Sequence, residues 1–265
     1  MLLSRSLRSV ALWVHLQHEK AYSYWKVYES GLVNPSRLTH GEREFYLKLR
    51  FALQGQALVV YDIGASLGII SGCLAKIPSV AAVHAFEPIP TVYARLVEGM
   101  RPYPQVHCHN MAVGHMAGSA TMYISKSTDS SSLLPMALLH KEEFPGTDVN
   151  DQIQVTVVRL DDYVCECRLP QPDLVKIDVQ GYEDRVLRGG SKTIGQARYC
   201  VLEMSLQPLY EGAPLFDDIY CLMRDMGFRL TSLAGTLFGK SGRQLQVDTI
   251  FENNRIDGDA LSSPE

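Results

Sequence analysis

Apolar residues follow two alternating patterns along the first half of this chain. Continuous apolar runs, typical of strands buried on both faces, occur at 58–61, 80–86 and 105–108. Between these runs, at 69–75 and 91–100, apolar residues recur at the spacing that gives a helix one apolar face. This order predicts a βαβαβ unit, the first half of a doubly wound, mostly parallel sheet of the Rossmann-like α/β class.

The second half of the chain is less regular. Residues 119–125 alternate like an antiparallel or edge strand, and 215–226 are predicted to form a helix. Residues 127–150 are polar and aperiodic and contain the serine cluster 130–132. A connection of this length is usually functional or disordered. Further strands are predicted at 153–160, 173–178, 199–204, 227–230 and 246–251.

These patterns divide the chain into a helical N-terminal extension at 1–55, an α/β domain at 56–252 and a polar tail at 253–265. The extension begins with basic residues and a short apolar stretch, which faintly resembles a signal peptide, but His15 interrupts it and no small-residue cleavage site follows. We expect an amphipathic helix instead, which can pack on its own domain or dock peripherally on a membrane or partner. Its apolar face would contain Leu7, Val10, Ala11 and Val14.

Composition narrows the class of protein. With 265 residues, a formal net charge of -4 and a pI near 6.1, the chain is unsuited to nucleic acid as its main partner. It contains no apolar run of about 18 residues, the length that a transmembrane helix needs. Cys165 and Cys167 form the only close cysteine pair and lack a second ligand pair, so we expect no metal site. The cysteine pattern suits a reducing, cytoplasmic compartment.

Residues 58–68, LVVYDIGASLG, join an apolar run to a small, flexible segment and a new helical stretch. This order predicts a parallel strand, a tight turn and a helix N-terminus. The carboxyl ends of parallel strands are where such sheets bind ligands, and a helix N-terminus there offers free N–H groups. We therefore expect a small polar ligand beside Asp62 and Gly64.

The identity of that ligand depends on two acids and on the glycine spacing. Asp62 and Glu87 each follow a predicted strand, and an acid after the second strand commonly binds ribose hydroxyls. A dinucleotide fingerprint needs glycines where this chain has Ser66 and Ile69. Asp62 would also repel a pyrophosphate, whereas it suits a cationic group such as the ammonium of a methionine moiety. S-adenosylmethionine is thus favoured over NAD, although Asp62 can also be read as a helix cap or turn residue.

Several motifs in a fixed order then point to a family. They are DIGASLG, HAFEP at 84–88, NMAVG at 110–114, SSSLL at 130–134, LDDY at 160–163, KIDVQGYE at 176–183, PLYEG at 208–212 and VDTIF at 247–251. Together they resemble the FkbM-type methyltransferases over residues 44–252. That family consists of class I, S-adenosylmethionine-dependent enzymes, mostly O-methyltransferases of sugars, glycolipids or natural products. The resemblance implies a seven-stranded sheet whose last strand is antiparallel to its neighbours.

The resemblance also implies where the cofactor lies. Ser66 stands where many members have Asn, and its hydroxyl can still form a hydrogen bond. The implied cofactor-binding residues are Asp62, Gly64, Ala65, Ser66 and Gly68 for the methionine end, Glu87 with Pro88 for the ribose, and Asn110, Met111 and Ala112 for the adenine. Asp178 is also expected to contact the cofactor.

A second set of polar residues is predicted where the methyl acceptor would arrive. Lys176 and Asp178 share one face of a buried strand, and Asp178 falls at its carboxyl end beside the cofactor. Charges in such a strand are costly unless they are paired or used. Asp178, Glu203 and His140 are therefore candidates for the base that deprotonates the acceptor, with Lys176 and Glu183 as helpers. The alternative is a structural Lys–carboxylate pair, and for His140 an ordinary solvated loop residue.

Other functions stay open at this point. Asp178 and Glu203 could hold Mg²⁺ through oxygen ligands, but the sequence shows no closely spaced third ligand. The chain could methylate nitrogen rather than oxygen, or bind the cofactor without catalysis and serve as a scaffold for a partner. An NAD oxidoreductase is the remaining alternative. The expected acceptor is a small molecule, glycan or glycolipid, whose identity the sequence does not give.

Overall fold

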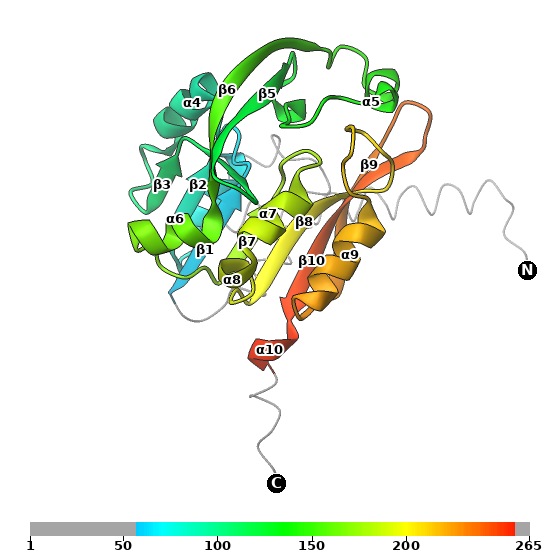
Figure 1. The fold of residues 1–265 in the computed structure, drawn as a ribbon. Coiled ribbons are helices and arrows are strands. Elements are labelled where there is room, and N and C mark those ends of the chain that lie inside the picture. Colours follow the sequence, from blue (N-terminus) through cyan, green and yellow to red (C-terminus); the bar gives the residue numbers. More distant parts are fainter. Residues whose placement is uncertain (1–56, 258–265) are drawn as a thin grey trace, which may run out of the picture.

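The computed structural model describes residues 57–257 (Figure 1). The predicted N-terminal extension, its amphipathic helix and most of the polar tail lie outside this range. The described elements form an α/β domain with two sheets. No helix within residues 57–257 has the length and apolarity needed to cross a membrane.

The main sheet has seven strands in the order β3-β2-β1-β7-β8-β10-β9. The pairs among β3, β2, β1, β7 and β8 are parallel, whereas β10 is antiparallel to both of its neighbours. The prediction of a mostly parallel seven-stranded sheet with an antiparallel last strand is confirmed. The strands are β1 (Leu58–Ile63), β2 (Val80–Phe86), β3 (Val106–His109), β7 (Leu174–Ile177), β8 (Tyr199–Ser205), β9 (Phe228–Phe238) and β10 (Gln244–Asn253).

Helices cover both faces of this sheet. One face packs against α6 (Leu160–Cys167), α7 (Glu183–Gly189), α8 (Ser191–Ile194) and α9 (Phe216–Asp225), which lie in front of the strands in Figure 1. The other face packs against α3 (Ile69–Ala75) and α4 (Pro90–Met100). Alternate residues of each central strand point to opposite faces and both are buried, as with Val60 and Tyr61 on β1. This double burial is why the strands are continuous apolar runs rather than alternating ones.

A small second sheet, in the order β4-β6-β5, lies above the main sheet in Figure 1. Its strands are β4 (Ala112–Gly114), β5 (Gly118–Ser125) and β6 (Val149–Arg159). The predicted strand at 119–125 does pair antiparallel, with β6. The sequence did not predict β4, because three residues in parallel pairing carry no readable period.

The polar segment 127–150 is ordered and attached to the domain. It contains the 3₁₀ turn η2 (Thr128–Ser130) and helix α5 (Leu138–Glu143), and β6 begins within it. Met136 forms an isolated bridge with Tyr210, and the carboxylate of Glu143 accepts hydrogen bonds from the N–H and hydroxyl of Ser241 at 3.0 and 2.6 Å. This segment therefore contacts the loop after β8 through Met136 and the β9–β10 hairpin through Glu143.

The C-terminal boundary lies slightly beyond the predicted one. Asn253, assigned from the sequence to the tail, ends β10 and is fully buried. Its side-chain amide donates to the carbonyl oxygens of Gly195 and Ala197 at 2.9 and 3.0 Å. A short helix, α10 (Asn254–Asp257), follows. A polar residue here belongs to the domain because it satisfies buried carbonyl groups, which composition alone does not reveal.

Candidate active site

A cavity of about 510 Å³ opens at the carboxyl ends of β1, β2, β7 and β8. Its walls come from these strand ends, from the loop after β3 and from the segment 127–147. Of the residues predicted from the sequence, the cavity is lined by Gly64, Ala65, Ser66, Glu87, Pro88, Met111, Ala112, His140, Lys176, Asp178 and Glu203. The tertiary structure therefore brings most of the predicted cofactor residues and the predicted catalytic residues to one cavity.

The turn after β1 forms the floor of one end of this cavity. The backbone N–H groups of Gly64 and Ala65 both donate to the carbonyl oxygen of Phe86, at 3.1 and 2.9 Å, which ties the turn to β2. Gly64 has φ of 83°, and a side chain there would collide with the backbone carbonyl of Asp178. Glycine is thus required both for the backbone conformation and for the close approach of the segment after β7.

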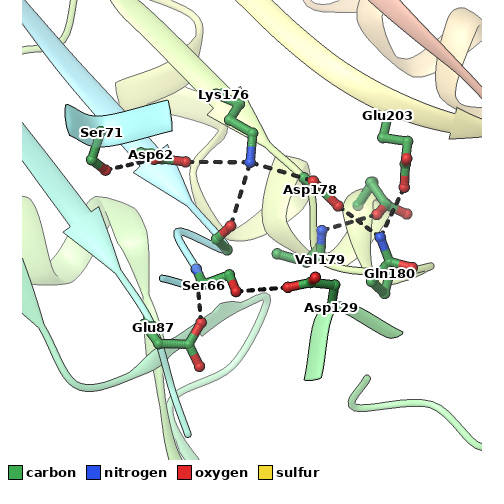
Figure 2. A network of polar contacts seen from close by, with 12 residues as sticks. Asp62, Ser66, Ser71, Glu87, Asp129, Lys176, Asp178, Val179, Gln180 and Glu203 are labelled. Atoms are coloured by element: carbon green, nitrogen blue, oxygen red, sulfur yellow. Dashed lines mark hydrogen bonds and ion pairs between the residues drawn. The ribbon is translucent and has the colours of Figure 1, made fainter. Parts of the chain in front are cut away.

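Ser66 and Glu87 form the polar part of this end (Figure 2). The N–H of Ser66 donates to Oε2 of Glu87 at 3.0 Å, and its hydroxyl donates to Oδ1 of Asp129 at 2.8 Å. Oε1 of Glu87 accepts the N–H of Ile89 at 2.8 Å. Burial raises the pKa of Glu87 to about 7, although the two backbone N–H groups act in the opposite direction. The hydroxyl of Ser66 is thus used for a contact with the segment 127–150, and Asp129 is a cavity residue that the sequence did not single out.

Three predicted cofactor residues do not line the cavity: Asp62, Gly68 and Asn110. Asp62 is fully buried, accepts a hydrogen bond from Ser71 at 2.6 Å and lies 3.4 Å from Nζ of Lys176. The cationic neighbour of Asp62 in the structure is therefore a lysine of this chain, in the place where we had expected a cofactor ammonium. Asn110 donates from its amide to the carbonyl oxygens of Glu87 and Pro88, at 2.9 and 3.1 Å, and so stabilises the loop after β2 that forms this part of the cavity wall.

Lys176 joins the two ends of the cavity. It is paired in register with Asp62 across β1 and β7, and its Nζ lies 3.4 Å from the Asp62 carboxylate, from the carbonyl oxygen of Gly64 and from Oδ2 of Asp178. Burial by itself lowers the pKa of Lys176, but the carboxylates of Asp62 and Asp178 outweigh this effect and the pKa is raised. The predicted alternation that places Lys176 and Asp178 together is confirmed, and the lysine is a fixed positive charge.

Gln180 connects Asp178 to Glu203. Its Nε2 donates to Oδ1 of Asp178 and to Oε2 of Glu203, both at 2.8 Å, and Glu203 also accepts from Nε2 of Gln246 at 2.7 Å. Figure 2 shows this series of contacts running from Ser71 through Asp62, Lys176 and Asp178 to Gln180 and Glu203. Enclosure by protein, with the nearby charges of Asp178, Asp248 and Glu183, raises the pKa of Glu203 well above its usual range. The ionised form of Glu203 is therefore disfavoured relative to that of an exposed glutamate.

Glu183 stabilises the turn after β7 through hydrogen bonds to its backbone. Its Oε1 accepts the N–H groups of Val179 and Gly181, at 3.3 and 3.0 Å, and burial raises its pKa to about 7. It does not line the cavity. Glu183 holds the turn that gives Gln180 its positive φ of 56°, a conformation that the sequence could not indicate for a glutamine.

His140 is buried, so the interpretation of an ordinary solvated loop histidine is wrong. Burial lowers its pKa, which favours the neutral imidazole. Its Nε2 lies 3.4 Å from the hydroxyl of Tyr210, and its Nδ1 lies 3.2 Å from Oγ1 of Thr147. The Tyr210 hydroxyl also lies 2.9 Å from Oε1 of Gln180. A hydrogen-bonded series therefore extends from Asp178 through Gln180 and Tyr210 to His140. Tyr210 and Gln180 belong to the PLYEG and KIDVQGYE motifs, but a motif alone assigns them no role.

The residues at the β1–β2 end fit a nucleoside-containing cofactor. Glu87 faces the cavity with a carboxylate able to accept ribose hydroxyls, and Pro88, Ile89, Met111 and Ala112 supply apolar surface beside it. The volume lies within the range of about 300–1,000 Å³ that is common for small-molecule sites.

The sheet order, its antiparallel β10 and the position of the cavity define a class I methyltransferase fold. The profile of the FkbM methyltransferase domain matches residues 62–230, and the chain belongs to this family. Its cofactor is accordingly S-adenosylmethionine, as predicted from the sequence.

Characterised relatives include three methyltransferases. The 2-O-methyltransferase NoeI of Sinorhizobium fredii is 31% identical over 160 residues, which cover 58% of this chain and 66% of NoeI, just under two thirds of its length. The 31-O-demethyl-FK506 methyltransferase FkbM of Streptomyces tacrolimicus is 26% identical over 68% of this chain and 76% of its own. The hexuronic acid methyltransferase AglP of Haloferax volcanii is 26% identical over 64% and 68%.

Solved structures resemble this chain more distantly. The magnesium protoporphyrin IX methyltransferase ChlM of Synechocystis superposes with a TM-score of 0.46 at 13% identity, over 81% of this chain and 80% of its own.

Proposed function

We propose that this protein transfers a methyl group from S-adenosylmethionine to a hydroxyl oxygen of a sugar-containing, lipid-linked or natural-product acceptor. The observation that carries the proposal is the position of Asp178. It lies at the carboxyl end of β7, lines the cavity and is oriented by two donors, Lys176 and Gln180. The names of NoeI and FkbM, both O-methyltransferases, support oxygen as the atom that receives the methyl group.

Asp178 is a better base than the other candidates. Burial raises the pKa of Glu203 well above its usual range, and one of its oxygens already accepts hydrogen bonds from two side-chain amides. His140 has both ring nitrogens within hydrogen-bond distance of protein hydroxyl groups. Asp178 is about one third exposed, which leaves its carboxylate accessible from the cavity. A base must reach the proton that it removes, so accessibility favours Asp178 over the buried His140.

The proposed reaction needs little covalent chemistry from the protein. When bound, S-adenosylmethionine supplies a methyl group on a positively charged sulfur, which makes that carbon electrophilic. Asp178 accepts a hydrogen bond from the acceptor hydroxyl, directs its oxygen towards that carbon and takes its proton as the O–CH₃ bond forms and the S–CH₃ bond breaks. Lys176 and Gln180 hold the Asp178 carboxylate in place, so that orientation is fixed before the acceptor arrives.

The test compares Asp178→Asn with Asp184→Asn. Asp184 lies nearby in α7 but does not line the cavity, so it controls for a change of one carboxylate to an amide. With methyl-labelled cofactor and a cell extract as the acceptor source, we expect D178N to lose about a hundredfold or more of the transfer rate and D184N to keep it. Calorimetry should show that both variants bind S-adenosylmethionine within about threefold of the wild type.

Two results would contradict this assignment. Full activity in D178N would exclude Asp178 as the base, and a selective loss of cofactor binding would assign Asp178 to the cofactor instead. If the wild type binds S-adenosylmethionine but labels nothing in the extract, the chain is a binding module rather than an enzyme. Label on nitrogen would replace O-methylation by N-methylation.

A further inference from the structure

Carboxyl groups outnumber cations on the described walls of the cavity. Lys176 is the only lysine or arginine among the described lining residues, and its Nζ is already engaged by two carboxylates and a carbonyl oxygen. The carboxyl groups that line the cavity are those of Glu87, Asp129, Asp178 and Glu203. Nothing in this part of the chain offers a second, unpaired cation to an incoming anion.

The acidic groups surround the position at which the acceptor is expected. Asp178 and Glu203 are bridged by Gln180 on one side, and Asp129 is exposed and held towards Ser66 on the other. His140 lines the same cavity, but burial lowers its pKa and so favours its neutral form. A second negative charge brought next to Asp178, whose side chain is about one third exposed, would meet a like charge in a partly desolvated site, where such contacts are unfavourable. Asp129 adds a weaker repulsion, because it is exposed and water screens its charge.

We propose that the residue of the acceptor that receives the methyl group carries no negative charge: it is a neutral or amino sugar, or an equivalent neutral or cationic unit, rather than a uronic acid or a phosphorylated or sulfated sugar. This inference rests on the proposed function and makes its acceptor class specific. It separates the chain from AglP, the relative that is named for a hexuronic acid, although AglP has a similar level of identity to FkbM. A neutral hydroxyl needs only a hydrogen-bond acceptor that already lines the cavity, namely the Asp178 carboxylate.

The first experiment identifies the charge of the natural acceptor. The full chain is incubated with methyl-labelled S-adenosylmethionine and an extract of source cells that lack the protein. The labelled material is hydrolysed to its building blocks, which are separated by anion exchange at pH 7. We expect the label in the unretained, neutral or cationic fraction. Label in a retained carboxylate, phosphate or sulfate fraction would overturn this inference while leaving methyl transfer intact. Absence of label from every fraction would overturn the proposed function and this inference with it.

The second experiment measures how strongly the protein prefers a neutral acceptor, with two compounds that differ only in one carboxylate. The acceptor identified in this way is compared with its counterpart in which a hydroxymethyl group is oxidised to a carboxylate. We expect kcat/KM for the neutral compound to be higher by about tenfold or more, which corresponds to ~1.4 kcal/mol.

Asp129→Asn should reduce this ratio by about threefold, because it removes one repelling charge. Asp148→Asn, an exposed residue outside the cavity that pairs with Lys126, should leave the ratio unchanged. Equal or faster methylation of the carboxylate compound, or the same ratio in D129N as in the wild type, would contradict the proposal.

Discussion

The two ends of the cavity are built in different ways. The end that fits the cofactor comes from two consecutive strand–loop units, with Gly64–Ser66 after β1 and Glu87–Pro88 after β2, and backbone N–H groups form many of its contacts. The end proposed for the acceptor depends on side chains that lie apart in the sequence: Asp178 and Gln180 after β7, Glu203 in β8 and Tyr210 beyond it. The first end is therefore set by local chain geometry, and the second by long-range packing.

This difference separates two kinds of specificity. Backbone contacts change little when side chains vary, so an end built from them suits one constant cofactor. Side-chain contacts that span the segment 127–150 and the turn after β7 can be altered by single substitutions, which suits an acceptor that differs between relatives. Lys176 is the exception, because its ammonium contacts residues that belong to both ends.

Replacing Lys176 by methionine should produce the largest loss of stability among these variants, because it removes the ammonium that contacts both ends of the cavity. The variant leaves the fully buried Asp62 carboxylate without its cation. Removing one partner of a buried pair typically costs about 3–5 kcal/mol, and we expect a loss of that size in the free energy of unfolding measured with urea. The double variant Asp62→Asn/Lys176→Met should lose less than the sum of the two single changes.

The control for this experiment is Lys126→Met, which disrupts an exposed pair with Asp148 at 3.8 Å. Exposed pairs contribute about 0–1 kcal/mol, so its stability should be nearly that of the wild type. A loss below about 1 kcal/mol in K176M would show that the buried lysine is not what holds Asp62 in the folded state.

The cofactor end alone is tested by the pH dependence of S-adenosylmethionine binding. Only an ionised Glu87 can accept hydrogen bonds from both ribose hydroxyls with its two oxygens, and burial raises its pKa to about 7. Affinity should therefore increase as the pH rises through 7 and level off above it, by about tenfold between pH 6 and pH 8 in calorimetry. Glu87→Gln should bind more weakly at pH 8 and lose this dependence. An unchanged profile in E87Q would remove Glu87 from the cofactor site.

Tyr210→Phe tests the acceptor end alone, and its expected effect is the smallest of the three. The variant removes a hydroxyl that lies 2.9 Å from Gln180 Oε1 and 3.0 Å from the carbonyl oxygen of Ser130, at a cost of about 1 kcal/mol in stability. Because this contact orders Gln180, KM for the acceptor should rise severalfold while the cofactor affinity stays constant.

The matched control is Tyr61→Phe, which loses a hydroxyl that donates to the carbonyl oxygen of Pro170 at 2.7 Å, outside the cavity. It should cost similar stability and leave KM unchanged. If Y61F and Y210F shift KM equally, the effect of Tyr210 is a general loss of stability rather than the ordering of Gln180.

Much of the fold could be predicted because burial acts directly on composition. Strands covered on both faces must be apolar throughout, so β2 (Val80–Phe86) could be bounded from its run of residues. The same argument fails for β4, which is too short for a period, and for α5, whose polar residues are buried through contacts with distant partners such as Tyr210. The end of β10 was also misplaced, because Asn253 is retained by hydrogen bonds rather than by apolarity.

The sequence by itself determined the parallel strands and the position of the ligand site at their carboxyl ends, because these depend on apolar runs, on glycines in a turn and on acids at strand ends. The family and its seven-stranded sheet followed from the resemblance of the ordered motifs. It also brought Lys176 and Asp178 to one face, since strand alternation is local. Only the tertiary structure decided that Asp62 is paired with Lys176 behind the cavity wall, that His140 is buried and that Gln180 bridges two carboxyl groups. Those facts depend on which distant residues meet and on how much water they exclude, and neither quantity is encoded in local spacing.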